Sequence, residues 1–407
     1  MRLPTLSSVC RPDCGAHAFF TSILVWGIGI GCFAATFNNF LVEFYDVQGT
    51  ERGTLEFFRE LPGVVLIALL ALLHRLTDWQ VLRIGTAVSL LAAGLLLVPV
   101  PWFGCVTIIA IWALGEHLVM PVRQSIALSI AKDGKSGESL GIVTGAVNAG
   151  SVIGSLVVAA VFWFGARLVG PEHQRLFYGI VWCIVALLLG ASLAFASSVK
   201  EPGRHDRPRP AFYVRRKYSK FYALELFYGA RKQVFFTFAP LVLIRHYGLE
   251  TSDIALLLAV SAFITALWGG RLIGRLVDGW GYRNVMIWDT VVLCFVCLLY
   301  GFAKDLFPAR IAFGVVCVNY ILDALLSNCS IATNLYARTL SDTQEELTAT
   351  LSTGISVNHI ITVGCAYLGG RAFDAYGAGA LFAFAALMAL ANSAFALTVP
   401  KPAKANH

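Results

Sequence analysis

Charged residues are scarce in this sequence of 407 residues. Asp, Glu, Lys and Arg together make up 14% of it, whereas an ordinary soluble domain contains about 25%. A soluble chain of this length needs many more polar side chains to cover its surface. The shortage of charge therefore excludes a soluble enzyme, a disordered chain and a nucleic-acid-binding protein.

The motifs of common catalytic and ATP-hydrolysing sites are absent as well. The sequence has no Walker-type phosphate loop, no HExxH zinc motif, no pair of CxxC motifs and no nucleophile elbow with suitable partners. Its ten cysteines are scattered, mostly within apolar segments, which is typical of small apolar residues and not of a disulfide framework. We therefore expect no enzymatic activity, no cofactor and no bound metal.

Long hydrophobic runs dominate the sequence instead. Hydrophobic residues make up 57% of the chain, and the mean hydropathy is +0.72. The run 84–115 has 32 residues without a charge, unlike the short alternating segments of an outer-membrane barrel. At about 20 residues per span, the runs predict an all-α integral membrane protein with twelve transmembrane helices. The expected spans are 18–42, 55–74, 81–100, 102–122, 140–164, 176–198, 221–244, 253–273, 284–302, 310–333, 350–370 and 376–398.

The distribution of Lys and Arg predicts the orientation of these spans. With both termini in the cytoplasm, 21 of the 31 basic residues fall on the cytoplasmic side and 7 on the outer side, in line with the positive-inside rule. Eight of them lie in the polar segment 200–220. We interpret this segment as a basic cytoplasmic linker between two six-helix bundles, residues 1–199 and 221–407; contact with anionic lipid is the alternative. The expected location is a bacterial inner membrane.

A short motif occurs twice, 200 residues apart. The second copy consists of Gly274, Leu276, Asp278, Gly281 and Arg283. The first copy has Leu76, Asp78 and Arg83 at the equivalent positions, with His74 and Val81 in place of the glycines. Glycine lets helices approach closely, and a carboxylate can accept hydrogen bonds from a helix N-terminus or pair with arginine. The repeat predicts a tight turn between two helices in each half, with a structural or gating role.

This motif resembles the cytoplasmic loop motif of the major facilitator superfamily, which follows helices 2 and 8 there. Gly141, Gly150 and Gly154 resemble the family's helix-5 signature, which is associated with exporters, while Ser155 and Val158 depart from it; close helix packing is the alternative reading. The resemblance implies two pseudo-symmetric bundles that move a small-molecule substrate by alternating access. It also implies a central cavity lined by helices 1, 4, 7 and 10. We expect a monomer in the lipid bilayer, without nucleic acid.

Polar side chains within the expected spans identify candidate substrate-binding residues, because a charge at mid-membrane costs roughly 2.5–3.5 kcal/mol. Arg231 and Lys232 lie in the expected span 221–244 and predict an anion-binding centre, since arginine binds carboxylate or phosphate with two parallel hydrogen bonds. An ion pair of either cation with Asp323, Glu116 or Glu225 is the alternative. The expected span 310–333 carries one polar stripe, formed by Asn319, Asp323, Ser327, Ser330 and Asn334. The expected span 18–42 adds Asn38 and Asn39.

Four further residues are candidates for proton coupling, because carboxylates and imidazoles suit reversible protonation. They are Glu116, His117, Asp323 and His359. Sodium remains the alternative coupling ion. In the expected span 55–74, Glu56, Arg59 and Glu60 lie within about one helical turn, so Arg59 can pair with either acid. We interpret this cluster as an outer gate, with a substrate site as the alternative. Asp289 lies nearer the cytoplasm, where we expect it to pair with a loop arginine.

Together these features predict a secondary active transporter for a small organic anion, coupled to protons. A proton-coupled exporter of amphipathic or cationic compounds is the alternative, with Glu116 or Asp323 attracting the cation. A membrane receptor or assembly factor that transports nothing is a third interpretation, although the longest expected loop, of about 20 residues, leaves no room for a soluble output domain.

Overall fold

The computed structural model describes residues 6–11, 15–73, 75–133, 135–199 and 213–401. In these ranges the chain is α-helical and contains no β-strand, apart from one isolated bridge between Cys10 and Ala131. His74 of the first motif copy and residues 200–212 of the expected linker lie outside the described residues.

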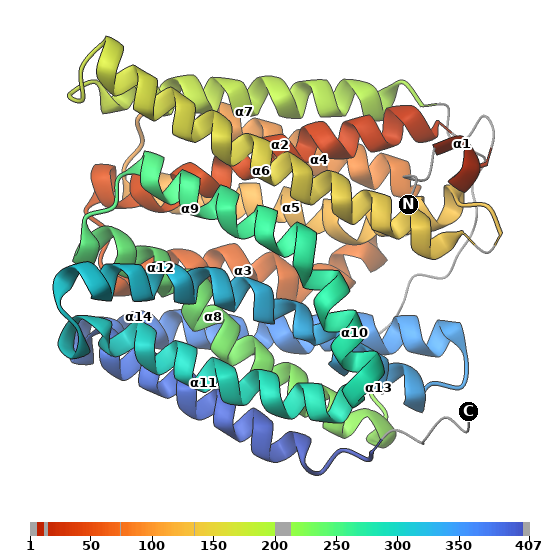
Figure 1. Ribbon diagram of the computed structural model, residues 1–407. Helices are drawn as coiled ribbons and strands as arrows, with labels where there is room; N and C mark the ends of the chain where they lie inside the picture. The colour runs from red at the N-terminus through yellow and green to blue at the C-terminus, as the bar shows by residue number, and fades with distance from the viewer. Residues whose placement is uncertain (1–5, 12–14, 74, 134, 200–212, 402–407) are drawn as a thin grey trace. The chain divides into compact units, whose positions relative to one another are not determined.

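Each of the twelve expected spans overlaps a helix (Figure 1). In chain order the α-helices are α1 (Leu6–Val9), α2 (Ala16–Tyr45), α3 (Gly49–Leu72), α4 (Asp78–Leu95), α5 (Trp102–Ile130), α6 (Ser136–Leu168), α7 (Gln174–Ser197), α8 (Ser219–Tyr247), α9 (Thr251–Ile264), α10 (Gly270–Trp280), α11 (Tyr282–Leu306), α12 (Ala309–Leu326), α13 (Ser330–Leu340) and α14 (Gln344–Ala396). Three short turns complete the set: the 3₁₀ turns η1 (Arg216–Tyr218) and η3 (Ser327–Cys329), and the π turn η2 (Thr265–Gly269).

Eight helical segments of the described chain are long and apolar enough to cross a membrane. Helices α3, α4 and α8 are not among them; charged and polar residues interrupt their apolar sequences. The last two expected spans both lie in α14, which is broken at Gly377, where φ is 81°. Membrane-spanning helices are thus present, while the count of twelve spans stays a prediction.

The helices form two compact units. Unit 1 consists of residues 1–45, 68–209 and 250–263, and unit 2 of residues 46–67, 210–249 and 264–407. Most of α3 therefore packs within unit 2, and α9 packs within unit 1. The expected division into bundles at residues 1–199 and 221–407 remains a prediction.

Unit 1 is built on close contacts of α2 with α6 and α7, and of α4 with α5. A Cβ atom at Gly31 would lie 2.5 Å from the carbonyl oxygen of Ser151, and one at Gly154 only 2.2 Å from that of Ile28. The helix-5 glycine at position 154 therefore serves close packing of α6 on α2. Aromatic rings fill the remaining space, with Phe33 stacked on Trp112 at 4.0 Å.

Unit 2 is centred on α14, which packs against α8 and α11. Helix α3 also approaches α14 closely, because a Cβ atom at Gly53 would lie 2.3 Å from the Ala366 carbonyl oxygen. The N-terminus of α3 is fixed by Asp374, whose carboxylate accepts hydrogen bonds from the backbone N–H groups of Gly49 (2.8 Å) and Thr50 (2.7 Å). A carboxylate at this position complements the positive end of the helix dipole.

Candidate functional site

Arg231, on α8, is one of the buried charged residues of unit 2. Its side chain is completely buried, and its NH1 donates a hydrogen bond of 3.0 Å to Oδ1 of Asp323 on α12. The guanidinium also lies over the Tyr228 ring, 4.8 Å from the ring centroid. The ion pair with Asp323, one of the two interpretations of Arg231, is therefore formed.

Several buried side-chain polar atoms of unit 2 have no hydrogen-bond partner within the described chain. Among them are Nε of Arg231, Nδ2 of Asn319 and Oδ1 of Asp289. Leaving such a group unsatisfied costs about 1–3 kcal/mol, and unsatisfied groups in folded proteins often mark a site that an ion, a water or a ligand completes. Arg231 and Asn319 thus offer donors that the protein itself does not use.

The expectation that Asp289 pairs with a loop arginine is wrong. Asp289 lies on α11, and among the described residues it forms no ion pair within 4 Å. The only charged group that acts on it electrostatically in the described chain is Arg231. Two carboxylates therefore act electrostatically on one buried guanidinium: Asp323 in direct contact, and Asp289 from beyond 4 Å.

Lys232 differs from its neighbour because its side chain is exposed. Its ammonium lies 6.0 Å from the centroid of the Tyr228 ring. Glu225, which precedes Lys232 by seven residues on the same helix, is partly buried. It accepts a hydrogen bond of 3.4 Å from Nδ2 of Asn358. Lys232 is thus the accessible cation of α8, and Arg231 is the enclosed one.

The polar stripe expected along the span 310–333 is not one continuous face. Helix α12 ends at Leu326, and a 3₁₀ turn precedes α13. A 3₁₀ turn has about three residues per turn, whereas an α-helix has 3.6. Side chains beyond the 3₁₀ turn are therefore rotated away from the face that precedes it. Asn319 is buried and Asp323 is paired, whereas Asn334 is exposed. The hydroxyl of Ser327 donates to the Asp323 carbonyl oxygen at 2.9 Å.

Helix α3 carries a buried ionic cluster. Glu56 is completely buried and accepts hydrogen bonds from Arg52 (2.5 Å) and from Arg59 (2.6 Å). Arg59 also lies over the Phe236 ring, 4.8 Å from its centroid. The sequence predicted that Arg59 pairs with an acid one turn away, but it did not identify Arg52. The spacing of four residues between Arg52 and Glu56 was the available signal.

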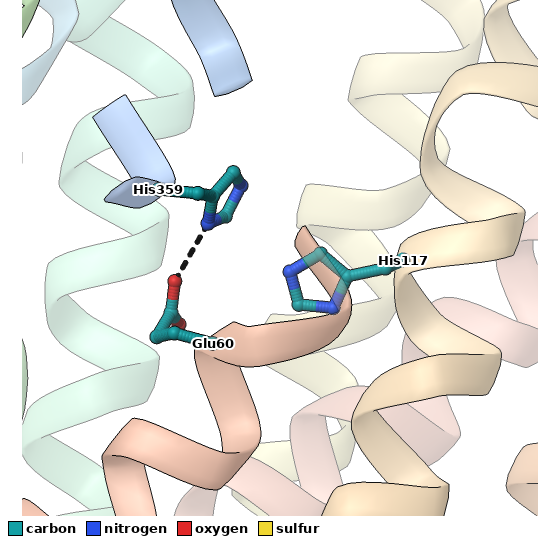
Figure 2. Close-up of side chains that lie close together, drawn as sticks. All are labelled: Glu60, His117 and His359. Atoms are coloured by element: carbon teal, nitrogen blue, oxygen red, sulfur yellow. Dashed lines mark hydrogen bonds and ion pairs between the residues drawn. The ribbon is translucent and has the colours of Figure 1, made fainter. Parts of the chain in front are cut away.

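The fourth member of that segment, Glu60, binds a residue far away in sequence. Its Oε2 lies 2.8 Å from Nδ1 of His359 on α14 (Figure 2). Gly63 leaves room for this imidazole, because a Cβ atom there would lie 2.6 Å from the same nitrogen. Thr362 adds a weaker hydrogen bond of 3.4 Å to Glu60. No local pattern links residues 299 positions apart, so sequence reasoning missed this pair.

The candidates of unit 1 occupy mixed environments. His117 on α5 is buried, with Nδ1 2.7 Å from the Ala113 carbonyl oxygen. Glu116 is partly buried and acts electrostatically on Arg123, whose guanidinium lies 5.0 Å from the Trp26 ring centroid. On α2, Asn39 is buried and Asn38 partly buried. The transport roles of these residues stay predictions.

The repeated motif makes equivalent contacts in its two copies. Arg83 donates hydrogen bonds of 3.1 Å to the carbonyl oxygens of Ala196 and Val199, at the C-terminal end of α7. Arg283, 200 residues later, donates a hydrogen bond of 2.7 Å to the Leu397 carbonyl oxygen, at the C-terminal end of α14. Each arginine thus complements the negative end of a helix dipole.

The aspartates of the motif differ. Asp78 accepts a hydrogen bond of 2.5 Å from the Ser125 hydroxyl, whereas Asp278 is exposed and forms no hydrogen bond or ion pair with the described chain. Gly281 has φ 79°, a left-handed conformation that favours glycine, and a Cβ atom at Gly274 would meet open space. Only the second glycine is therefore required by the backbone.

Outside the membrane-spanning segments, two ion pairs and a hydrogen bond connect the end of the expected basic linker to the start of α14. Lys217 forms ion pairs with Asp342 (2.9 Å) and Glu346 (2.7 Å), and the Tyr213 hydroxyl donates to Glu346 at 2.9 Å. The hydrogen bond from Lys217 is the main cause that lowers the pKa of Glu346 to about 2. The bond to Glu346 is in turn the main cause that raises the pKa of Lys217.

Solved structures with the same fold are membrane transporters. A variant of the nucleoside transporter NupG has a TM-score of 0.74 and 11% identity, covering 96% of this chain and 100% of that one. A bacterial homologue of the human lysosomal transporter Spinster gives 0.62 and 16%, covering 94% of each chain. A POT family transporter in complex with 5-aminolevulinic acid gives 0.71 and 13%, covering 94% of this chain and 95% of that one. At these identities the likeness shows the fold.

No curated protein matches the sequence significantly. The sequence model of the Major Facilitator Superfamily, however, matches residues 61–337, which is more than half of the chain. This match agrees with the loop motif and with the transporter fold of the structural neighbours, and it indicates a membrane transporter and not an enzyme. The chain belongs to the major facilitator superfamily.

Proposed function

We propose that this protein is a secondary active transporter that moves a small organic anion by alternating access, coupled to protons. The observation that carries the proposal is the completely buried Arg231, whose Nε has no acceptor within the described chain. A buried guanidinium with an unused donor is costly unless a ligand completes it. A carboxylate or phosphate can bind such a guanidinium through two parallel N–H groups.

Asp323 determines which N–H groups of Arg231 remain available to the anion. It holds one N–H of Arg231 at 3.0 Å, so the ion pair is neutral while the site is empty of substrate. An entering anion takes the remaining donors of Arg231, and the exposed Lys232 adds a second positive charge on the same helix. The unused amide donor of Asn319 supplies a neutral hydrogen bond. These three donors support a small anion with several oxygen acceptors as the substrate class.

The wider proposal assigns the other candidates to the transport cycle. Asn38 and Asn39 contact the polar part of the substrate, while Glu116, His117, Asp323 and His359 carry protons. The loop residues Asp78, Arg83, Gly274, Asp278, Gly281 and Arg283, and the cluster Glu56, Arg59 and Glu60, act in gating. The chain works as a monomer with twelve spans in a bacterial inner membrane, with both termini in the cytoplasm. The two bundles rock around the site, as in other carriers built from repeats.

The structural neighbours are compatible with this substrate class but do not select it. One is a nucleoside transporter, and another was solved with 5-aminolevulinic acid, which is an acid by name. The choice of an anion for this chain rests on Arg231 and Lys232.

A thermal-shift screen of the purified protein tests the proposal, because a ligand stabilises the state that it binds. The probes are lactate, succinate, citrate, inorganic phosphate and, as a cation, choline. We expect at least one anion to raise the Tm of the wild type and of Arg310→Gln, a control at an exposed arginine of the same unit. The shift should vanish in Arg231→Gln.

Two results would overturn the proposal. An anion-induced shift that persists in Arg231→Gln would place the anion elsewhere, and stabilisation by choline alone would favour the exporter of cationic compounds. Uptake of the stabilising anion into proteoliposomes distinguishes a carrier from a receptor, since a receptor binds its ligand without flux.

A further inference from the structure

Asp289 is a partly buried acid of α11 that the anion site does not use. Its Oδ1 has no hydrogen-bond partner within the described chain. The neighbouring Thr290 hydroxyl donates to the carbonyl oxygens of Met286 (3.0 Å) and Ile287 (3.1 Å) and not to the carboxylate. Among the described residues, only the guanidinium of Arg231 and the backbone N–H of Thr290 stabilise a negative charge on Asp289. An ionised carboxylate is poorly satisfied there.

The first copy of the repeat shows that the fold does not need an acid at this place. Ser89 follows Arg83 by six residues, as Asp289 follows Arg283. The Ser89 side chain is completely buried, and its hydroxyl donates to the Trp112 carbonyl oxygen at 3.4 Å. A small neutral residue thus serves the same helix position in the first half, so the carboxyl group of Asp289 has a role other than packing.

The charges around Arg231 make the protonation state of Asp289 decisive. Arg231 and Lys232 carry two positive charges, whereas Asp323, Glu225 and an ionised Asp289 carry three negative charges. The site then has one net negative charge and repels an anion. A proton on Asp289 removes this excess negative charge, so that an anion can bind at Arg231.

We infer that Asp289 takes the coupling proton at the anion site in place of Asp323, which keeps its ion pair with Arg231. This inference rests on the proposed function and deepens it. The proton joins Oδ1 from water on one side of the membrane, allows the anion to bind at Arg231, and returns to water on the other side after the anion leaves. Arg231 then stabilises the ionised Asp289 until the next proton arrives.

The surroundings of Asp289 favour a proton over a metal cation. Metal cations such as Mg²⁺ and Ca²⁺ take six or more oxygen ligands, whereas the residues around Asp289 supply one carboxylate. The titratable groups that interact with it are Arg231 of α8 and Cys329 of η3, and Asp323 of α12 acts through Arg231. A cation next to the carboxylate opposes a second bound cation, while a proton simply neutralises the acid.

Infrared difference spectroscopy of the protein in lipid tests this assignment without a substrate. As the pH is stepped across neutrality, the wild type should show the C=O stretching band of a protonated carboxyl group. The band should be lost in Asp289→Asn and in Asp289→Ser, the residue that the first copy has at this position. It should remain in Asp278→Asn, which removes an exposed acid of the same unit. Thermal unfolding of each variant verifies that it is folded.

The outcomes separate this inference from the proposed function. Spectra of Asp289→Asn and Asp289→Ser that match the wild type would refute the proton site, even if anions still bind at Arg231. A titration midpoint that shifts when Na⁺ replaces choline would make Asp289 a sodium site and would also refute it. Loss of the band together with anion binding that persists in Arg231→Gln would keep the proton site and reject the anion site.

Discussion

The Arg231–Asp323 ion pair allows a sharp prediction, because substituting Arg231 and substituting Asp323 should lower the free energy of unfolding by different amounts. In Asp323→Asn, Arg231 stays buried but keeps Asp289 as a second carboxylate at longer range. In Arg231→Gln, Asp323 and Asp289 both lose their only buried cation. Breaking a buried ion pair costs about 3–5 kcal/mol, since it leaves an uncompensated charge. We therefore expect Arg231→Gln near the upper end of that range and Asp323→Asn near the lower end.

The double variant completes the cycle. With both charges of the direct pair removed, only Asp289 remains, and a neutral pair of similar volume restores much of the loss. The double variant should be more stable than Arg231→Gln, with a coupling free energy of at least about 1 kcal/mol. Reversible unfolding in mixed micelles gives the free energies, and Arg310→Gln reports the effect of removing an exposed arginine.

Two results would refute this reasoning. If the two single substitutions add up in the double variant, the ion pair is not formed in the folded protein. If Asp323→Asn is at least as destabilising as Arg231→Gln, Asp289 does not act on Arg231, and the charge count around the site fails.

Two further predictions concern other parts of unit 2. Gly63→Ala places a methyl group 2.6 Å from the imidazole of His359 and should destabilise the fold by about 1–3 kcal/mol. Gly314→Ala adds its methyl group in open space within a helix and should stabilise the fold by about 0.4–1 kcal/mol. Thermal unfolding compares the two variants, and equal effects on stability would contradict the close packing of Gly63 on His359. The pKa of Glu346 is lowered to about 2, and the pKa of Lys217 is raised. The ion pair between them therefore stabilises the fold from about pH 5 to pH 10. The Tm difference between wild type and Lys217→Gln should be constant over that range and shrink as the pH falls towards 2; a difference that grows in acid would contradict the ion pair.

The helices could be predicted from the sequence because long apolar runs leave few other structures possible in a membrane. The Arg83 and Arg283 contacts were not predicted as such, but the repeat marked both residues. The ion pair of Arg231 with Asp323 was one of two stated alternatives, since buried charges need partners. In these cases a local pattern or a simple charge rule was sufficient.

Other features depend on contacts that no local pattern encodes. The bond between Glu60 and His359 joins segments 299 residues apart, and the 3₁₀ turn at 327–329 interrupts a stripe that helical periodicity draws as continuous. The position of Asp289 nearer the cytoplasm favours a loop arginine as its partner, whereas the charged group that acts on it is the buried Arg231. Tertiary packing decided each of these.

The two copies of the repeat separate what the fold requires from what is particular to the second half. Arg83 and Arg283 make the same kind of contact with a helix end in both halves, which marks a structural requirement shared by the copies. Ser89 and Asp289 occupy equivalent positions, yet only the second is an acid. Since the first half buries a neutral residue there, the fold does not require a carboxyl group at this point. A costly group that the fold can do without indicates function, and the electrostatic effect of Arg231 on Asp289 supports the proposed coupling of proton movement with anion binding.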